Sequence, residues 1–256
     1  MSLQPRLRVI GPRVFLTREH VARLFGEGTR LEFAQAWGVQ AGFVSQQRVD
    51  AATALGRLQA VPVMGPHAGI SRLECPWGQA QLLGLEPPVR HSGDVEGAPR
   101  VTLLGPRGHV ELEQGVISLT RRLACPAEKA RQLGLMDGDR VVCALRSHRR
   151  GDVREAVRDG MLAEVFVQVT ADFELELHLD SDDAAALRVH DGDMAFLVEA
   201  GRPRTSAGRL PVGRLVGERE VRAAREQGLR IHISKGMVLT PSARDLGREW
   251  DLFDFE

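Results

Sequence analysis

The stretch GVISLTRRLACPAEKARQLGLMDGDRV, residues 115–141, shows in one segment the pattern that recurs along this chain. It begins with β-branched and leucine residues that predict a strand, and an arginine pair, Arg121 and Arg122, follows. A proline then stands at the start of a helical pattern, and an Asp-Gly-Asp turn leads into another apolar run. We therefore expect strand, short helix, turn and strand in that order.

The second half of this unit is repeated. Residues 130–145, ARQLGLMDGDRVVCAL, match residues 184–198, AAALRVHDGDMAFLV, and residues 80–89 form a third copy in which Pro-Pro replaces the Gly-Asp turn. Short strands, glycine turns and one-turn helices at this spacing are typical of small β-barrels capped by helices. The predicted fold class is mainly β (α+β), with two related helix-capped β-barrels and a C-terminal helical appendage.

Local signals place several boundaries. GPRG, residues 105–108, predicts a tight turn between strands at 101–104 and 109–112, and Thr17 and Thr240 precede helical patterns as N-caps. Residues 201–208, GRPRTSAG, predict a linker, whereas residues 31–58 show no clear period.

Composition excludes several classes of function. The 256 residues include 34 basic and 34 acidic side chains, so there is no electrostatic footprint for nucleic acid or an anionic membrane. We find neither a signal peptide nor an apolar run near the roughly 20 residues that span a bilayer. Three separated cysteines make no disulfide framework, which favours a cytoplasmic location.

The glycine-containing pieces carry little chemistry by themselves. GPRG and a second piece, GPHAG at residues 65–69, lack the spacing of phosphate-binding loops, so hairpin turns are the preferred interpretation. HSGD, residues 91–94, holds Ser, His and Asp, but adjacency in sequence does not make a triad. His178 lies with Glu176 on the polar phase of LELHLD, where either a ligand or a structural role fits.

Three motifs in order carry a family resemblance: SGDVEGAP at residues 92–99, the GPRG hairpin, and DFELELHLD at 172–180. Over about residues 7–198 the chain resembles the phosphate propanoyltransferases of the propanediol-utilisation type. The resemblance implies two β-barrels that exchange an element, at residues 12–119 and at 1–11 with 120–200, leaving 201–256 as linker and appendage. It also implies a homodimer, transfer of an acyl group between coenzyme A and phosphate, and work inside bacterial microcompartments.

The resemblance further implies a two-metal site, with zinc the expected ion, but most of its ligands are missing. The family's His-x-His-Leu motif is replaced here by Arg13, Val14, Phe15 and Leu16, and its Arg-His-x-His motif is replaced by residues 121–124, RRLA. Arginine, phenylalanine and alanine do not ligate a divalent metal, and only Glu74 and His178 remain at ligand positions.

We therefore expect no metal cofactor, unless Glu74 and His178 join a rebuilt site. Such a site would draw on nearby side chains: Cys75, Cys125, His20, His67 and His91. However, Cys75 follows Glu74 on a strand and should face the other way, into the core. In the other interpretation, Arg13 and Arg122 pair with Glu74 and either bind an anion or close the site as a salt-bridged plug.

The function that this pattern predicts is a divergent family member, inactive or weakly active, that serves as a binding or assembly component of a microcompartment. The rival hypothesis is a working phosphate acyltransferase with a remodelled site. Its catalytic remnant would be Ser92, Glu74 and His178, with Arg13, Arg122 and Arg90 binding substrate or anion. A third hypothesis is a sensor of coenzyme A or a nucleotide.

The tail, residues 209–256, lies outside the acyltransferase resemblance. It resembles a segment of the ethanolamine-utilisation corrinoid adenosyltransferases, and it ends in the aromatic sequence WDLFDFE. Two interpretations stay open: a helix that packs on the barrels, or a docking segment for a shell or core protein of the microcompartment.

Overall fold

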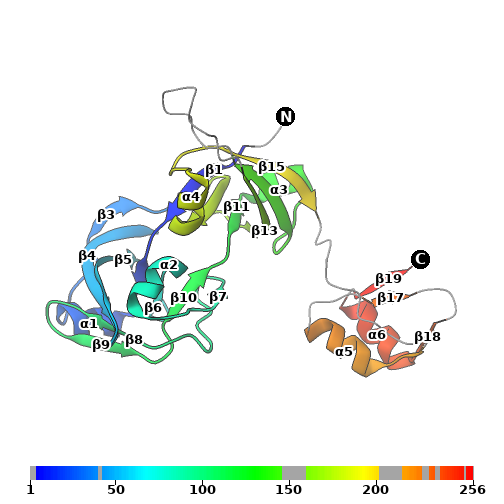
Figure 1. Cartoon of the computed structure of the whole chain (residues 1–256), viewed down its shortest axis with the longest axis horizontal. Coiled ribbons are helices and arrows are strands. Elements are labelled where there is room, and N and C mark those ends of the chain that lie inside the picture. The colour runs from blue at the N-terminus through cyan, green and yellow to red at the C-terminus, as the bar shows by residue number, and fades with distance from the viewer. Residues whose placement is uncertain are drawn as a thin grey trace. The chain divides into compact units, whose positions relative to one another are not determined.

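The structure, a computed structural model, describes residues 4–39, 42–145, 160–201, 215–226, 231–233, 237–250 and 252–255 (Figure 1). The chain divides into two compact units, Met1–Arg202 and Pro203–Glu256, which are described separately. Most of the predicted linker, residues 202–208, lies outside the described residues. None of the described helices is long and apolar enough to cross a membrane.

The first unit is mainly β, and its larger sheet has nine strands in the order β7-β10-β6-β2-β5-β4-β8-β9, with β3 paired to β4. Its strands are β2 (Arg13–Phe15), β3 (Phe33–Ala36), β4 (Phe43–Ala52), β5 (Arg57–Gly65), β6 (Arg72–Glu74), β7 (Val89–Arg90), β8 (Val101–Leu104), β9 (His109–Leu112) and β10 (Val116–Leu119). Two helices, α1 (Arg18–Phe25) and α2 (Trp77–Ala80), and a 3-10 turn, η1 (Gln81–Leu83), accompany them. The hairpin predicted around GPRG is confirmed, since Gly105 N donates to Gly108 O at 2.9 Å.

The second sheet has six strands in the order β1-β14-β11-β13-β12-β15. They are β1 (Arg6–Ile10), β11 (Arg122–Cys125), β12 (Arg140–Leu145), β13 (Gly160–Val169), β14 (Glu176–Asp180) and β15 (Ala195–Gly201), with helices α3 (Ala127–Leu133) and α4 (Ser181–Leu187). Each sheet buries its own group of apolar side chains, one centred on Val14 and Leu103 and the other on Leu123 and Leu177. The predicted domain boundaries themselves stay a prediction.

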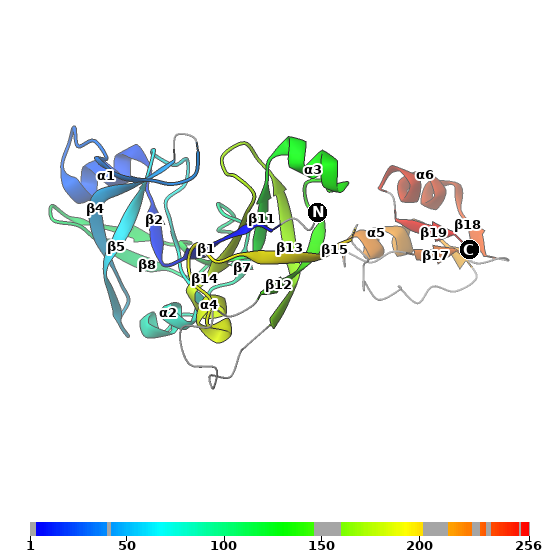
Figure 2. The ribbon, with the colours of Figure 1, turned by 90° about the horizontal axis from the view of Figure 1, so that it is seen from above.

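The chain crosses between the sheets at two described places, from β1 to β2 (Figure 2) and from β10 to β11 (Figure 1). Gly11 and Pro12 make the first crossing, so β1 belongs to the six-stranded sheet although β2 belongs to the nine-stranded one. Thr120 and Arg121 make the return crossing. Arg13 and Arg122 are the first strand residues after these crossings, which places both near the junction of the sheets.

The internal repeat is confirmed in the hydrogen bonding. After α3, the Asp139 carboxylate accepts from Met136 N at 2.7 Å, and after α4, the Asp193 carboxylate accepts from His190 N at 2.9 Å. In each copy, the side chain of the last aspartate of Asp-Gly-Asp therefore accepts a hydrogen bond from a backbone N–H three residues earlier, as aspartate side chains commonly do in turns. Because β12 and β15 pair antiparallel, the two copies lie side by side in one sheet.

The second unit, Pro203–Glu256, has its own small core, which includes Val221, Ile231 and Phe253. It holds helices α5 (Glu218–Glu226) and α6 (Pro241–Glu249) and two parallel strand pairs, β16 (Leu215–Val216) with β18 (Val238–Leu239) and β17 (Ile231–Ile233) with β19 (Phe253–Phe255). Thr240 caps α6 as predicted, since its side chain accepts from Ala243 N at 3.2 Å.

Candidate functional site

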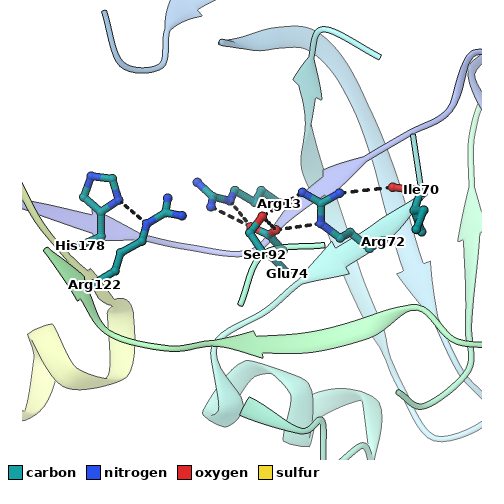
Figure 3. A network of polar contacts seen from close by, with 7 residues as sticks. All are labelled: Arg13, Ile70, Arg72, Glu74, Ser92, Arg122 and His178. Atoms are coloured by element: carbon teal, nitrogen blue, oxygen red, sulfur yellow. Dashed lines mark hydrogen bonds and ion pairs between the residues drawn. The ribbon is translucent and has the colours of Figure 1, made fainter. Parts of the chain in front are cut away.

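Strand register brings the sequence-predicted residues together in two cross-strand pairs. Arg13 on β2 lies opposite Glu74 on β6, and Arg122 on β11 lies opposite His178 on β14, both in antiparallel register. Directly opposed residues point to the same face of a sheet, so each pair is in contact range. The two pairs face the junction of the sheets, where Figure 3 shows them in one network.

Glu74 is the centre of the first pair and is 1% exposed. Its Oε2 accepts from Arg13 Nε at 2.8 Å and pairs with Arg13 Nη2 at 2.7 Å, while its Oε1 accepts from Arg72 Nε at 2.8 Å and from the Ser92 hydroxyl. Burial alone would raise the pKa of the Glu74 carboxyl, but the charges of Arg13 and Arg72 outweigh it and lower the pKa. Glu74 is therefore an ionised carboxylate with both oxygens engaged.

His178 is the centre of the second pair and is also 1% exposed. Arg122 Nε lies 2.9 Å from His178 Nδ1, and His178 Nε2 lies 3.0 Å from Glu176 Oε2. Because a guanidinium only donates, Nδ1 must accept and Nε2 must carry the proton. Burial and the nearby Arg122 charge lower the pKa of His178 to about 4, so the imidazole is neutral at physiological pH.

The other two positions that replace expected ligands are also integrated into this packing. The Phe15 ring lies 3.9 Å from the guanidinium carbon of Arg72. Ala124 lies opposite Glu176, whose carboxylate instead accepts two hydrogen bonds of 2.7 Å from Arg8. Each of the four residues that stand at expected ligand positions, Arg13, Phe15, Arg122 and Ala124, thus lies against a side chain of this site.

Sequence reasoning missed Arg72, which bridges Glu74 and Ser92 by donating to Ser92 Oγ at 2.9 Å. A usable signal existed, because residues two apart on a strand share a face and Arg72 precedes Glu74 by two. It also missed Trp37, whose ring lies 4.7 Å from the Arg13 guanidinium, and Phe173, whose ring meets His178 edge-on at 4.7 Å. These aromatic residues lie outside the strands, where periodicity gives no guidance.

A cavity of about 290 Å³ opens beside the network. Its lining includes Ser92, Arg122 and His178, together with His91 and Gln168. The structure does not bring Arg90 into the network. That side chain is exposed and lies 3.5 Å from the carboxylate of Asp94.

The residues present do not fit a two-metal centre. A metal would need the lone pair of His178 Nδ1 and an oxygen of Glu74, but Arg122 donates to the first and arginines hold both oxygens of the second. No three His, Cys, Asp or Glu side chains gather into a ligand set within the described parts of the chain.

Four of the side chains considered for a rebuilt site, Cys75, Cys125, His20 and His91, have other surroundings. Cys75 packs in the core of the nine-stranded sheet, and burial raises the pKa of its thiol to about 12. Cys125 belongs to the core of the six-stranded sheet. The Nδ1 atom of His20 lies 2.7 Å from Ser71 Oγ. His91 lies beside the cavity, but its Nδ1 is 3.3 Å from Thr120 Oγ1.

Comparison with known sequences places the chain among the acyltransferases. Residues 7–190 match the family model described as phosphate propanoyltransferase. The phosphate propanoyltransferase of Thermotoga maritima is 34% identical over 186 residues, which cover 73% of this chain and 85% of that protein. The enzyme of the same name from Limosilactobacillus reuteri is 31% identical over 198 residues, 76% of this chain and 88% of that protein. The chain belongs to the phosphate propanoyltransferase family.

Proposed function

We propose that this chain is a divergent phosphate propanoyltransferase family member in which an arginine network replaces metal-dependent chemistry. The observation that carries the proposal is that Arg13, Arg72 and Arg122 occupy the acceptor atoms of Glu74 and His178. In such a position a bound metal would polarise the acyl carbonyl and stabilise its oxyanion. Because Glu74 and His178, the two remaining candidate metal ligands, are both engaged by arginines, the expected acyl transfer from coenzyme A to phosphate is absent or weak.

The proposal includes the architecture. Each sheet, with its helices, closes as a small capped β-barrel, and residues 1–11 are the element exchanged between barrel 12–119 and barrel 120–200. Two separate cores and the position of β1 in the six-stranded sheet support this division. Residues 201–256 form the linker and appendage, and the compactness of Pro203–Glu256 is its support.

The proposed role is a binding or assembly component inside a bacterial microcompartment in the cytoplasm, as a homodimer. The appendage docks on a shell or core protein, because a unit with its own small core is suited to a partner-binding task. To test this, shell proteins are co-purified with the full chain and with a chain that lacks residues 203–256. Unchanged co-purification by the shortened chain would contradict the docking role.

A second candidate function, a working acyl-CoA:phosphate acyltransferase with a remodelled site, is favoured by the cavity. Ser92, Arg122 and His178 line the same cavity, so acyl-coenzyme A would bring its thioester to a hydroxyl and a guanidinium. Arginine stabilises an oxyanion and holds phosphate, so transfer without a metal is chemically permitted.

One experiment separates the two functions. Thiol release is measured from acetyl- and propanoyl-coenzyme A with phosphate, and the metal content of the same preparation is determined. The proposal expects no turnover or only a trace, and no stoichiometric metal. Turnover at ordinary enzymatic rates, on the order of 1–1000 per second, would overturn it in favour of the remodelled enzyme.

A further inference from the structure

An aromatic contact joins the two sheets beside the network. Trp37 directly follows β3 of the nine-stranded sheet, and Phe173 lies just before β14 of the six-stranded sheet. Their ring centroids are 6.3 Å apart and the ring planes meet at 84°, which is the edge-to-face geometry that aromatic rings favour. The two rings therefore attract one another across the junction of the sheets.

The backbone reinforces this contact. Val39 N donates to the carbonyl oxygen of Asp172 at 2.7 Å, so residues next to the two rings are also bonded across the junction. The two segments approach closely here, because a Cβ at Gly38 would lie 2.3 Å from the same carbonyl oxygen. Residues 37–39 thus form one short segment that is fitted to the loop before β14.

The two rings cover charged and titratable residues of the network. The guanidinium carbon of Arg13 lies 4.7 Å from the centre of the Trp37 ring, and that of Arg122 lies 5.8 Å from the centre of the Phe173 ring. The Phe173 ring meets the His178 imidazole edge-on at 4.7 Å. The aromatic contact therefore closes one side of the junction over residues of both cross-strand pairs.

Keeping the arginines under these rings costs free energy. Arg13 is 4% exposed, and its Nη1 atom has no hydrogen-bond partner among the described residues, which is unfavourable for a buried donor. Burial, followed by the charge of Arg13, lowers the pKa of Arg122 to about 10, so the charged form of Arg122 is disfavoured there. Water that entered the junction would relieve both costs. Desolvation of the arginines thus opposes the closed arrangement that the two rings stabilise.

A second contact between the sheets is polar and joins α2 to α4, which lie side by side (Figure 2). Gly78 N on α2 donates to a carboxylate oxygen of Asp182 at 2.7 Å. The next residue of α4, Asp183, accepts two hydrogen bonds of 2.6 Å from Arg121, at the crossing between β10 and β11. Because the start of α4 is bonded both to α2 and to this crossing, it is suited to be the hinge side of the junction.

We propose that Trp37 and Phe173 form a latch between the two sheets. While their contact holds, the junction is closed on this side, and when it breaks, the sheets part there and water reaches the covered residues. The cavity of about 290 Å³ is lined by Arg122 and His178, whereas Arg13, under the Trp37 ring, is not among its lining residues. The latch is therefore a regulatory contact, since Arg13 becomes accessible from the cavity only in the open state.

The latch requires neither acyl transfer nor a metal, so this inference goes beyond the proposed function. Trp37 and Phe173 are positioning residues in it, because they act by burying Arg13, Arg122 and His178. A reporter of that burial, and not of turnover, is needed to test the latch.

The pKa of His178, measured by NMR on the full chain, is such a reporter. The ring is 1% exposed, and the charged groups that act on it are Glu176, Arg122 and Arg13. Burial is the main cause that lowers its pKa to about 4, so Trp37→Ala should raise the pKa to about 5 or above, at least a tenfold gain in proton affinity. Phe173→Leu should raise it in the same way.

The double variant separates a latch from two independent covers. In a latch, either substitution breaks the same contact, so Trp37→Ala with Phe173→Leu should raise the pKa of His178 no further than the more effective single variant. Trp77→Ala is the matched control, because Trp77 is 48% exposed on α2 and should leave the pKa of His178 unchanged. Increases that add in the double variant would overturn the latch.

Circular dichroism shows whether each variant is folded. If Trp37→Ala does not fold, Trp37→Phe replaces it and should raise the pKa of His178 by a smaller amount. The proposal is also overturned if the pKa is the same in the unmodified chain and the folded Trp37 variant, or if it is near 6.5 in the unmodified chain. Thiol release and metal content judge the proposed function separately, and neither result alters the outcome for the latch.

Discussion

Arg122 Nε donates to His178 Nδ1 across 2.9 Å between two antiparallel strands, and this contact fixes the histidine as a neutral acceptor. The proton on His178 Nε2 faces Glu176. The same lone pair that would bind a metal is therefore held by a cation. This one relationship gives His178 a structural role, as a buried hydrogen-bond acceptor, in a site that does not suit metal ions.

Stability should depend on pH through His178. Its pKa is about 4 in the folded chain and 6.5 in the unfolded chain, so between these values the unfolded chain binds the extra proton. The free energy of unfolding should be at its highest value with respect to this group above about pH 6.5. It should fall by on the order of 3 kcal/mol as the pH drops to about 4. Urea unfolding across this window measures it.

The control compares two histidine variants. His178→Gln should flatten the slope between pH 6.5 and 4, whereas His190→Gln, at a side chain that is 62% exposed, should leave the slope as it is. An equal slope in the unmodified chain and His178→Gln would contradict the assignment.

Glu74→Gln should strongly destabilise the fold. The change removes a buried charge and leaves Arg13 and Arg72 uncompensated, which typically costs about 3–5 kcal/mol. The control variant is Glu113→Gln. Glu113 forms a 3.1 Å ion pair with Arg100, and both side chains are at least 66% exposed, so this pair differs from the buried one in its exposure to solvent. That variant should change the free energy of unfolding by less than about 1 kcal/mol. Similar losses in both variants would argue against the buried network.

Removal of metal ions by a chelator should not change the thermal stability of the unmodified chain. The acceptor atoms of Glu74 and His178 are engaged by arginines, so EDTA should leave the unfolding temperature unchanged. Placing histidine at four positions, Arg13→His, Phe15→His, Arg122→His and Ala124→His, should create zinc binding and EDTA sensitivity, because imidazoles ligate zinc. A chelator-induced drop in the unmodified chain would count against the arginine network.

The loop after β3 should tolerate no side chain at Gly38. A Cβ there would lie 2.3 Å from the backbone oxygen of Asp172, at a φ of +83°. Gly38→Ala should lower the free energy of unfolding by about 2–4 kcal/mol, from the left-handed backbone and the clash together. Gly28→Ala isolates the backbone part, since its φ is +75° and a Cβ would meet nothing within 4 Å. If Gly38→Ala and Gly28→Ala lowered the free energy of unfolding equally, the contact between the Cβ at position 38 and the Asp172 oxygen would carry no energetic penalty of its own.

The three cysteines should resist thiol reagents until the chain unfolds. Cys75, Cys125 and Cys143 are all buried, and burial raises the pKa of Cys75 and of Cys143 to about 12. Only the thiolate reacts, so labelling should follow global unfolding in urea. Rapid labelling of one thiol in the folded chain would contradict this expectation.

Local patterns predicted much of the fold. Thr17 and Thr240 cap the helices that follow them, and the Asp-Gly-Asp turns recur as the repeat indicated. Residues 31–58 show no clear period in the sequence, because β3 is exposed along its whole length and β4 carries register shifts. Neither feature produces the alternation from which strands are recognised.

The sequence by itself determined the family, the repeated strand–helix–turn unit and the identity of four site residues: Arg13, Glu74, Arg122 and His178. Only the tertiary structure decided what these residues do to one another. Strand register and two crossings between sheets place Arg13 on Glu74 and Arg122 on His178, and they add Arg72 and Trp37 to the same interior. Contacts between segments more than 50 residues apart depend on how sheets pair, and no local period records that pairing.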